Sequence, residues 1–213
     1  MAGGRFLRLA EATPESVLTS FVRVAREGHL LLFPTDTVYG LGGRADREET
    51  VAAIFEAKRR PAELALPVLV GSREQLGDVV GSWPEGAERL ARRFWPGPLT
   101  LVLPRAPGLS ALLSPGRETV GVRLPDHPAL LSWLRACDFP MAVTSANLSG
   151  QPPAVTTGEI APELREAAGL LLDGGRCPEG RASTVADVTG AEPRILRPGP
   201  VSEEEIRAVW TAS

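Results

Sequence analysis

The sequence contains very little lysine. Of its 23 basic residues, Lys58 is the only lysine and the other 22 are arginines. A lysine ammonium is a compact point charge, whereas an arginine head is planar, so the two are poor substitutes at a crowded anionic centre. Lys58 opens the segment 58–61, KRRP, about twenty residues after a hydroxyl-rich turn at 34–40, PTDTVYG. Together the two segments indicate a pocket that handles phosphate groups.

Long apolar runs, cysteine and histidine are also scarce. No run approaches the roughly 18 apolar residues of a membrane helix, and the first residues do not form a signal-peptide core, so we expect a cytoplasmic protein without membrane contact. Cys137 and Cys177 lack metal-ligand spacing, and only His29 and His127 could assist them. We therefore expect two reduced thiols and no metal site built from protein ligands.

The charge balance is weakly acidic. A net charge of −3 provides no overall basic field that would attract nucleic acid or anionic lipid. Any contact with tRNA or double-stranded RNA is therefore expected to be local and weak.

Helical and strand patterns alternate along the chain, which predicts an α/β fold. With 213 residues, 43% of them hydrophobic, we expect one domain over 1–213 with a substantial core. The expected strands are 30–33, 66–70, 99–103, 119–124, 140–144, 170–173, 183–188 and 194–196. The expected helices follow Thr13, Asp46 and Ser202 as N-caps, end near Phe94, and span 128–136 and 160–168.

Residues 40–45, GLGGRA, match the dinucleotide pattern G-x-G-x-x-A and precede the helix expected after Asp46. In that fingerprint the first glycine follows its strand closely, so that pyrophosphate meets the helix N-terminus. Here 34–39 intervene, so no dinucleotide site is predicted. A P-loop, a serine nucleophile elbow and a metalloprotease helix are also absent from the sequence. His127 is expected at a helix start, in a capping or surface role and not in acid-base catalysis.

Six short segments instead carry hydroxyl, amide or cationic groups near the ends of expected strands. In α/β sheets ligands bind where strand ends meet loops, so these segments can converge on one polar, cationic crevice. Each segment taken alone is also compatible with an ordinary turn. The glycine- and arginine-rich segment 174–181 is either a surface loop or a mobile lid. The six segments are 35–37, 58–60, Arg123, 144–147, 183–184 and 197–199.

At these segments the chain resembles the YrdC-like threonylcarbamoyl-AMP synthases. The motifs that carry the resemblance are 33–42 (FPTDTVYGLG), 58–61 (KRRP), 95–100 (WPGPLT), 122–125 (VRLP), 144–150 (TSANLSG), 183–185 (STV) and 196–199 (LRPG). The resemblance implies an open, twisted mixed sheet flanked by helices around a cationic cavity. It also implies an enzyme that joins L-threonine, bicarbonate and ATP into threonylcarbamoyl-adenylate and releases pyrophosphate. A separate, downstream transfer enzyme then modifies the adenosine next to the anticodon of tRNA.

The resemblance further implies roles for ten residues. Lys58 and Arg60 are the expected catalytic residues, and Mg²⁺ is expected to arrive with ATP. The expected ATP-binding residues are Lys58, Arg60, Thr119, Ser145, Asn147 and Arg197. The expected threonine-binding residues are Thr35, Arg123, Val143 and Ser183.

One departure from the family pattern follows the KRRP motif. Family members usually carry a polar residue or a lysine or histidine and then proline before the next strand, where this chain has Leu64 and Ala65. This difference puts a substrate contact from that stretch in doubt, but not the roles of Lys58 or Arg60. The chain resembles the short form of the family, without the extra C-terminal domain.

Two alternatives stay open. One is a related carbamoyl-transfer module of hydrogenase maturation, which belongs to a much longer chain with further parts. The other is a non-catalytic paralogue that binds nucleotide or double-stranded RNA. Against the second, the acidic charge and the lack of interleaved aromatic and basic residues do not favour a strand-binding platform.

Overall fold

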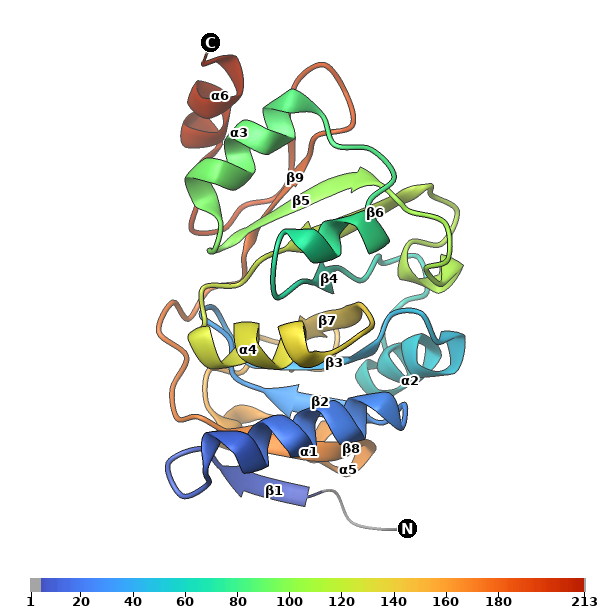
Figure 1. The fold of residues 1–213 in the computed structure, drawn as a ribbon, viewed down its shortest axis with the longest axis vertical. Helices are drawn as coiled ribbons and strands as arrows, with labels where there is room; N and C mark the ends of the chain where they lie inside the picture. Colours follow the sequence, from blue (N-terminus) through green and yellow to red (C-terminus); the bar gives the residue numbers. More distant parts are fainter. Residues whose placement is uncertain (1–4, 213) are drawn as a thin grey trace.

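A ten-stranded mixed sheet, with helices on both faces, forms the centre of the protein (Figure 1). The structure is a computed structural model, and it describes residues 5–212. The strands are β1 (Arg5–Arg8), β2 (Leu30–Phe33), β3 (Gly40–Arg44), β4 (Val68–Leu69), β5 (Leu99–Pro104), β6 (Thr119–Arg123), β7 (Met141–Ser145), β8 (Ala168–Asp173), β9 (Thr184–Asp187) and β10 (Arg194–Arg197). The α-helices are α1 (Pro14–Arg26), α2 (Glu48–Lys58), α3 (Glu85–Phe94), α4 (Pro128–Ala136), α5 (Pro162–Ala167) and α6 (Glu203–Thr211).

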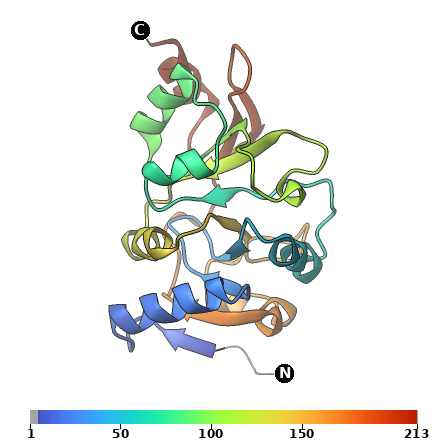
Figure 2. The ribbon, with the colours of Figure 1, turned by 45° about the vertical axis from the view of Figure 1, so that its right-hand side comes forward.

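The strand order is β1-β8-β2-β3-β7-β4-β6-β5-β9-β10. Four neighbouring pairs are parallel, namely β1 with β8, β2 with β8, β4 with β6 and β5 with β9, and the other pairs are antiparallel. Figure 2 shows α4 and α2 on opposite sides of the strands. The predicted α/β class with an open mixed sheet is confirmed.

Most of the predicted helix starts are confirmed by capping contacts. The Thr13 hydroxyl accepts a hydrogen bond from the Ser16 amide at the start of α1. The Nδ1 atom of His127 accepts from the Leu130 amide at 3.1 Å, so His127 caps α4 as expected. Ser202 forms a reciprocal capping box at the start of α6. Such caps satisfy amides that have no partner within the helix.

The start of α2 differs from the prediction, whereas its end agrees. Asp46 is not the N-cap, because its carboxylate pairs with Arg44, and Arg47 occupies the cap position without a side-chain hydrogen bond. The helix ends at Lys58, and Arg59 then turns the chain with a left-handed backbone, φ 49°. Lys58 and Arg60 therefore lie at a junction between helix and loop, as predicted.

The glycine-rich segment expected before α2 is a strand. β3 pairs antiparallel with both β2 and β7 in the middle of the sheet. A Cβ atom on Gly42 would lie 2.9 Å from the Ala142 carbonyl oxygen, and one on Gly43 would lie 2.4 Å from Thr50 Cγ2. These glycines permit the close approach of neighbouring elements, a role that overrides their low preference for strands.

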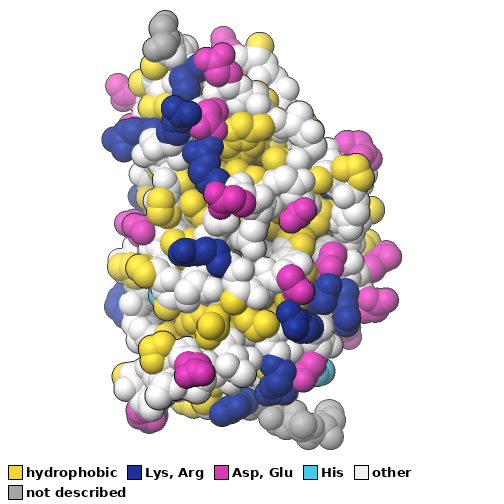
Figure 3. Space-filling model, viewed as in Figure 1, with side chains coloured by type: hydrophobic (Ala, Val, Ile, Leu, Met, Phe, Trp, Pro, Cys, Tyr) yellow, Lys and Arg dark blue, Asp and Glu magenta, His cyan; other side chains and the backbone are white. Residues whose placement is uncertain are grey.

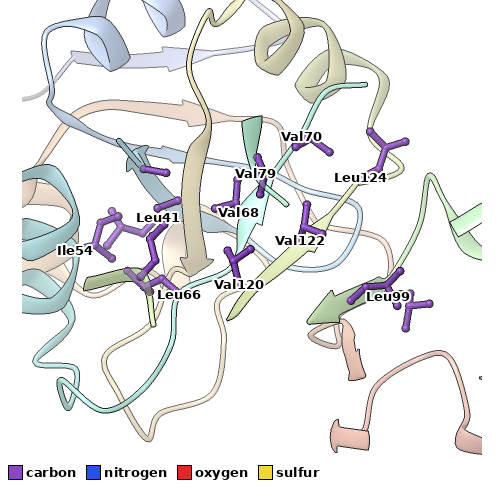
Figure 4. Packing of buried hydrophobic residues seen from close by; sticks show 14 of the residues in the cluster. Leu41, Ile54, Leu66, Val68, Val70, Val79, Leu99, Val120, Val122 and Leu124 are labelled. Atoms are coloured by element: carbon purple, nitrogen blue, oxygen red, sulfur yellow. The ribbon is translucent and has the colours of Figure 1, made fainter. Parts of the chain in front are cut away.

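Two hydrophobic clusters cover the two faces of the sheet. One cluster involves α2 and α3 and includes Val120 and Val122 of β6 (Figure 4). The other cluster involves α1 and α4 and includes Leu69 and Val143. Because side chains alternate along a strand, Thr119, Gly121 and Arg123 face away from the first cluster.

The outer surface carries charges of both signs. Figure 3 shows basic and acidic side chains interspersed on the face seen in Figure 1, including over α3. Within residues 5–212, none of the helices is both long and apolar enough to span a bilayer.

Candidate functional site

A cavity of about 330 Å³ lies over the central strands, on the face that β6 turns away from the first cluster. Its floor consists of three rows of side chains that run across neighbouring strands. The rows follow from the strand register, in which Leu69 pairs with Arg123 and Val102 pairs with Gly121. The inner row contains Leu69, Thr100 and Arg123, the middle row contains Pro67, Val102, Gly121 and Val143, and the outer row contains Thr119 and Ser145.

The side chains that line the cavity include several basic groups. Among its described lining residues are four arginines, Arg60, Arg117, Arg123 and Arg197, and no aspartate or glutamate. Burial lowers the pKa of Arg60, Arg123 and Arg197, and the positive charges of Arg123 and Arg60 lower the pKa of Arg197 further. Guanidinium groups stay protonated in proteins, so their mutual repulsion favours an anionic ligand.

Arg123 is held at the buried end of the cavity with donors to spare. Its Nε donates to the Gly97 carbonyl at 2.9 Å, Nη1 donates to the Thr37 hydroxyl at 3.0 Å, and Nη2 donates to the Asp36 carboxylate. A guanidinium has five N–H groups, so two remain for a ligand. The other carboxylate oxygen of Asp36 is buried and has no hydrogen-bond partner among the described residues.

The hydroxyl-rich turn is ordered by its own side chains. The Thr35 hydroxyl donates to the Val38 carbonyl at 2.7 Å and accepts from the amides of Thr37 and Val38. These contacts fix Thr35 and Thr37 in the lining, next to Arg123. The turn follows β2 directly, which places hydroxyl groups at a strand end.

A second set of hydroxyl groups lies beside Arg197. Its Nη2 donates to the carbonyl of Ser183 at 2.8 Å and to the hydroxyl of Ser183 at 3.1 Å. The same hydroxyl is 2.8 Å from that of Thr100. Val143 lines the cavity on β7, on the other side of β4, β6 and β5. Ser183 and Arg197, which were predicted to bind different substrates, are therefore in direct contact.

Arg60 is fixed by the stretch where the sequence departs from the family pattern. Its Nη2 donates to the Ala65 carbonyl at 2.8 Å, and its Nε donates to the Leu64 carbonyl at 3.3 Å. Both residues also line the cavity, with Leu64 46% exposed. Since backbone carbonyls make these contacts, the side chains at 64 and 65 can vary without releasing Arg60.

Lys58 and Asn147 lie behind the cavity wall and not in its lining. Lys58 is only 1% exposed, and its ammonium donates to the carbonyls of Ser145 and Asn147 and, at 3.4 Å, to the Asn147 side-chain oxygen. Burial, with a further effect of the Arg60 charge, lowers the pKa of Lys58 to about 7. Lys58 thus holds the loop that presents Ser145. Its predicted contact with the triphosphate stays a prediction.

The structure brings the other predicted residues together. Eight of the ten line the cavity: Thr35, Arg60, Thr119, Arg123, Val143, Ser145, Ser183 and Arg197. Sequence reasoning missed Arg117, Thr100 and Gly121, which also line it. Strict alternation from Thr119 to Arg123 could have identified Gly121. Arg117 follows a Pro-Gly turn, where its amide donates to the Ser114 carbonyl.

Hydrogen bonds connect the segment 174–181 to the hydroxyl-rich turn at 34–40. The Tyr39 hydroxyl donates to the Gly175 carbonyl at 2.7 Å, and the amides of Glu179 and Gly180 donate to the carbonyls of Asp36 and Thr37. Burial raises the pKa of Tyr39, so its hydroxyl remains a donor at neutral pH. Whether the segment acts as a lid stays a prediction.

A known protein family matches most of the chain. The family model Sua5_yciO_yrdC, described as "Telomere recombination", matches residues 23–199. The chain belongs to the Sua5/YciO/YrdC family. The resemblance inferred from the motifs is thereby confirmed.

Individual relatives extend the match over most of the chain. A putative threonylcarbamoyl-AMP synthase of Mycobacterium tuberculosis is 44% identical over 192 residues, 90% of this chain and 88% of that protein. The threonylcarbamoyl-AMP synthase of Pyrococcus abyssi is 45% identical over 184 residues, 86% of this chain and 54% of that protein. The crystal structure of P. abyssi Sua5 complexed with L-threonine superposes with a TM-score of 0.89 at 41% identity and covers 96% of this chain and 59% of that chain. The chain thus spans about 60% of that longer relative.

Proposed function

We propose that this protein is a nucleotidyltransferase that makes threonylcarbamoyl-adenylate from L-threonine, bicarbonate and ATP, and releases pyrophosphate. The observation that carries the proposal is the cavity itself. Arg123 offers two unused N–H groups at the buried end, and Thr119, Ser145 and Arg60 offer hydroxyl and cationic groups toward the other end. The names of the related proteins and the threonine complex of the P. abyssi protein support the same activity.

The amino acid fits the inner end of the cavity. Its carboxylate accepts the two remaining N–H groups of Arg123, since a guanidinium matches a carboxylate in charge and geometry. Thr35 and Ser183 lie within this end and offer hydroxyl groups to the polar atoms of threonine. Val143 presents an apolar surface suited to the threonine methyl group.

The nucleotide fits the outer end. Thr119 and Ser145 supply hydroxyl groups there, and Arg60 supplies charge for the phosphates. Arg197, which is held beside Ser183, supplies a further positive charge to the nucleotide from the inner row. Lys58 and Asn147 act from behind Ser145, where the lysine adds positive charge and fixes the loop. This arrangement stabilises the charge that develops as pyrophosphate leaves.

The proposed reaction has two steps, carbamate formation and adenylation. The protonated amino group of threonine first loses a proton. Its nitrogen then bonds to the carbon of bicarbonate while a C–O bond breaks, and water is released. A carbamate oxygen then bonds to the α-phosphorus of ATP, and the bond from that phosphorus to pyrophosphate breaks. The carbamate is short-lived, so the site acts by holding the reactants close together and excluding water.

Mg²⁺ is proposed to enter with ATP. The described lining contains no carboxylate that could coordinate the ion, and the orphaned oxygen of Asp36 is enclosed outside that lining. Mg²⁺ commonly binds through substrate phosphates and retained waters, which this cavity can accommodate. When bound, the ion would neutralise phosphate charge. The contribution of the protein is to place the arginines around those phosphates.

The product is proposed to pass to a downstream transfer enzyme that modifies tRNA. The cytoplasmic location, the tRNA pathway and the assignment of one domain over 1–213 stay predictions. The mixed charge of the face in Figure 3 favours no extended RNA contact on that face.

An omission experiment tests the proposed function. Pyrophosphate release is measured with ATP, Mg²⁺, L-threonine and bicarbonate, and then with each of the four left out, all without tRNA. We expect release only in the complete mixture, and slower release with serine. An absolute need for tRNA, or equal turnover with serine and threonine, would count against the proposal. RNA binding without any pyrophosphate release would favour the non-catalytic alternative.

A further inference from the structure

We infer that the recess over Gly121 is the subsite for the carboxyl group that bicarbonate contributes to the carbamate. The inference rests on the proposed function and adds to it a place for the third substrate. It concerns the middle row of the cavity floor, in which the sequence analysis assigned no residue to bicarbonate.

The position of Gly121 follows from the register of β6. Thr119, Gly121 and Arg123 alternate on the cavity face of one strand, and two residues along a strand span about 6.6 Å. The amino acid carboxylate is assigned to Arg123, and the nucleotide is assigned to the end with Thr119 and Ser145. The group that joins the threonine nitrogen to the α-phosphorus must therefore lie over Gly121.

The backbone does not require glycine at this position. Gly121 is not among the glycines with positive φ, so its extended conformation is open to any residue. Glycine within a strand costs about 0.5–1 kcal/mol relative to alanine. A Cβ atom here would lie 3.2 Å from Thr100 Cγ2 and 3.4 Å from Pro67 Cβ, so an alanine requires Thr100 to move by a few tenths of an ångström but meets no backbone atom at close range. Neither conformation nor packing explains the glycine as well as space in the cavity does.

The walls of the recess suit a short-lived carbamate. The other members of the middle row, Pro67, Val102 and Val143, present apolar side chains to the cavity. Apolar side chains give water no hydrogen-bond partner, so they protect the carbamate from hydrolysis. The polar inner and outer rows hold the two ends of the reactants, and the apolar middle row leaves room for a planar carboxyl group.

The test is Gly121→Ala, assayed by pyrophosphate release while bicarbonate is varied in a buffer depleted of carbon dioxide. We expect kcat/KM for bicarbonate to fall on the order of 100-fold, because a reactant displaced by about 1 Å loses that much rate. The separate affinities for threonine and ATP, from calorimetry, should stay within about 3-fold. Gly77→Ala is the matched control, because Gly77 lies outside the cavity and a Cβ there meets nothing within 4 Å.

A double variant distinguishes two effects of Gly121→Ala, namely the filling of the recess and the displacement of Thr100. Gly121→Ala with Thr100→Ser keeps the hydroxyl that contacts Ser183 and removes the methyl group that the new Cβ meets. We expect it to restore thermal stability but not the use of bicarbonate. Recovery of activity in the double variant would overturn the inference, as would unchanged bicarbonate dependence or an equal loss of threonine affinity in Gly121→Ala.

A second single variant covers the case in which Gly121→Ala does not fold. Val102→Leu enlarges the neighbouring side chain of the middle row, and a similar selective loss for bicarbonate is expected. A Val102→Leu enzyme with parental bicarbonate dependence would count against the subsite. If the parent protein itself releases no pyrophosphate, the proposed function fails, which is a different result from any of these.

Discussion

Arg123 and Asp36 form an ion pair at the buried end of the cavity, where their side chains are only 6% and 7% exposed. Burying two charges is costly unless hydrogen bonds satisfy them. Arg123 is satisfied by Gly97, Thr37 and Asp36, whereas one oxygen of Asp36 has no partner among the described residues. The pair fixes the guanidinium so that its unused N–H groups are available to a ligand.

Replacing Asp36 by Asn should weaken both folding and threonine binding. The variant leaves the Arg123 charge buried without its counter-ion, and removing one partner of such a pair typically costs about 3–5 kcal/mol. Unfolding by denaturant and calorimetry with threonine measure the two effects. Asp138→Asn, in an exposed pair with Arg26, is the control and should change little. A stable Asp36→Asn protein with parental threonine affinity would contradict this role.

Arg123→Ala should lower threonine affinity far more than ATP affinity. Loss of a charge-assisted contact of this kind costs roughly 2–4 kcal/mol, which corresponds to about 30- to 1000-fold. Calorimetry with each ligand measures the two affinities separately. Arg23→Ala on the exposed face of α1 is the control. Normal threonine binding in Arg123→Ala would mean that this arginine is purely structural.

Lys58→Arg should retain ATP binding within a few-fold and lose most turnover. The lysine is enclosed among the carbonyls of Ser145 and Asn147, and a larger planar head cannot keep that arrangement. We expect turnover to fall on the order of 100-fold, since Ser145 would shift relative to the phosphates. Lys58→Ala should lose both ATP binding and turnover. A fully active Lys58→Arg enzyme would show that the choice of lysine is incidental.

The low pKa of Lys58 predicts a pH dependence of stability. In the unfolded chain the lysine holds its proton up to the ordinary pKa of 10.5, whereas in the folded protein it releases the proton near pH 7. Between these values the unfolded state binds more protons, so this group makes the free energy of unfolding rise with pH, by at most about 1.4 kcal/mol per pH unit. Denaturant unfolding of the parent and of Lys58→Met at pH 7 and 8.5 measures the difference. Equal pH slopes in the two proteins would argue that the lysine stays charged.

Tyr39→Phe should loosen the segment 174–181. The hydroxyl donates to the Gly175 carbonyl and accepts from the Gly174 amide, and phenylalanine makes neither contact. We expect faster hydrogen exchange in this segment and a several-fold weaker threonine affinity, because the segment is tied to the turn that holds Thr35. Ser202→Ala, at the distant cap of α6, should leave this exchange unchanged. Parental exchange rates in Tyr39→Phe would exclude this coupling.

Local sequence signals predicted most elements because caps and alternation act over short distances. The helix starts at Thr13, His127 and Ser202 depend on neighbouring side chains, and the sequence shows them directly. The strand β3 was not predicted because its glycines are required by close tertiary contacts with Ala142 and Thr50. No local sequence pattern reveals such contacts. β1 was missed because four residues at a sheet edge provide little periodicity.

The motifs predicted which residues form the site, but not which of them line the cavity and which lie behind its wall. The motifs identified eight residues that line one cavity, yet they could not show that Lys58 lies behind Ser145. That position depends on how the end of α2 packs against the loop after β7. Gly121 was missed because a residue without a side chain carries no chemical signal until the register of the sheet is known.

The most direct test of the proposed reaction traces the carbon atom of bicarbonate into the nucleotide product. The purified protein is incubated with ATP, Mg²⁺, L-threonine and ¹³C-labelled bicarbonate, without tRNA, and the nucleotide products are analysed at once by mass spectrometry. We predict a threonylcarbamoyl-adenylate that contains the heavy carbon and forms together with pyrophosphate. Threonyl-adenylate without the added carbon, or hydrolysis of ATP with no adenylate at all, would contradict the account.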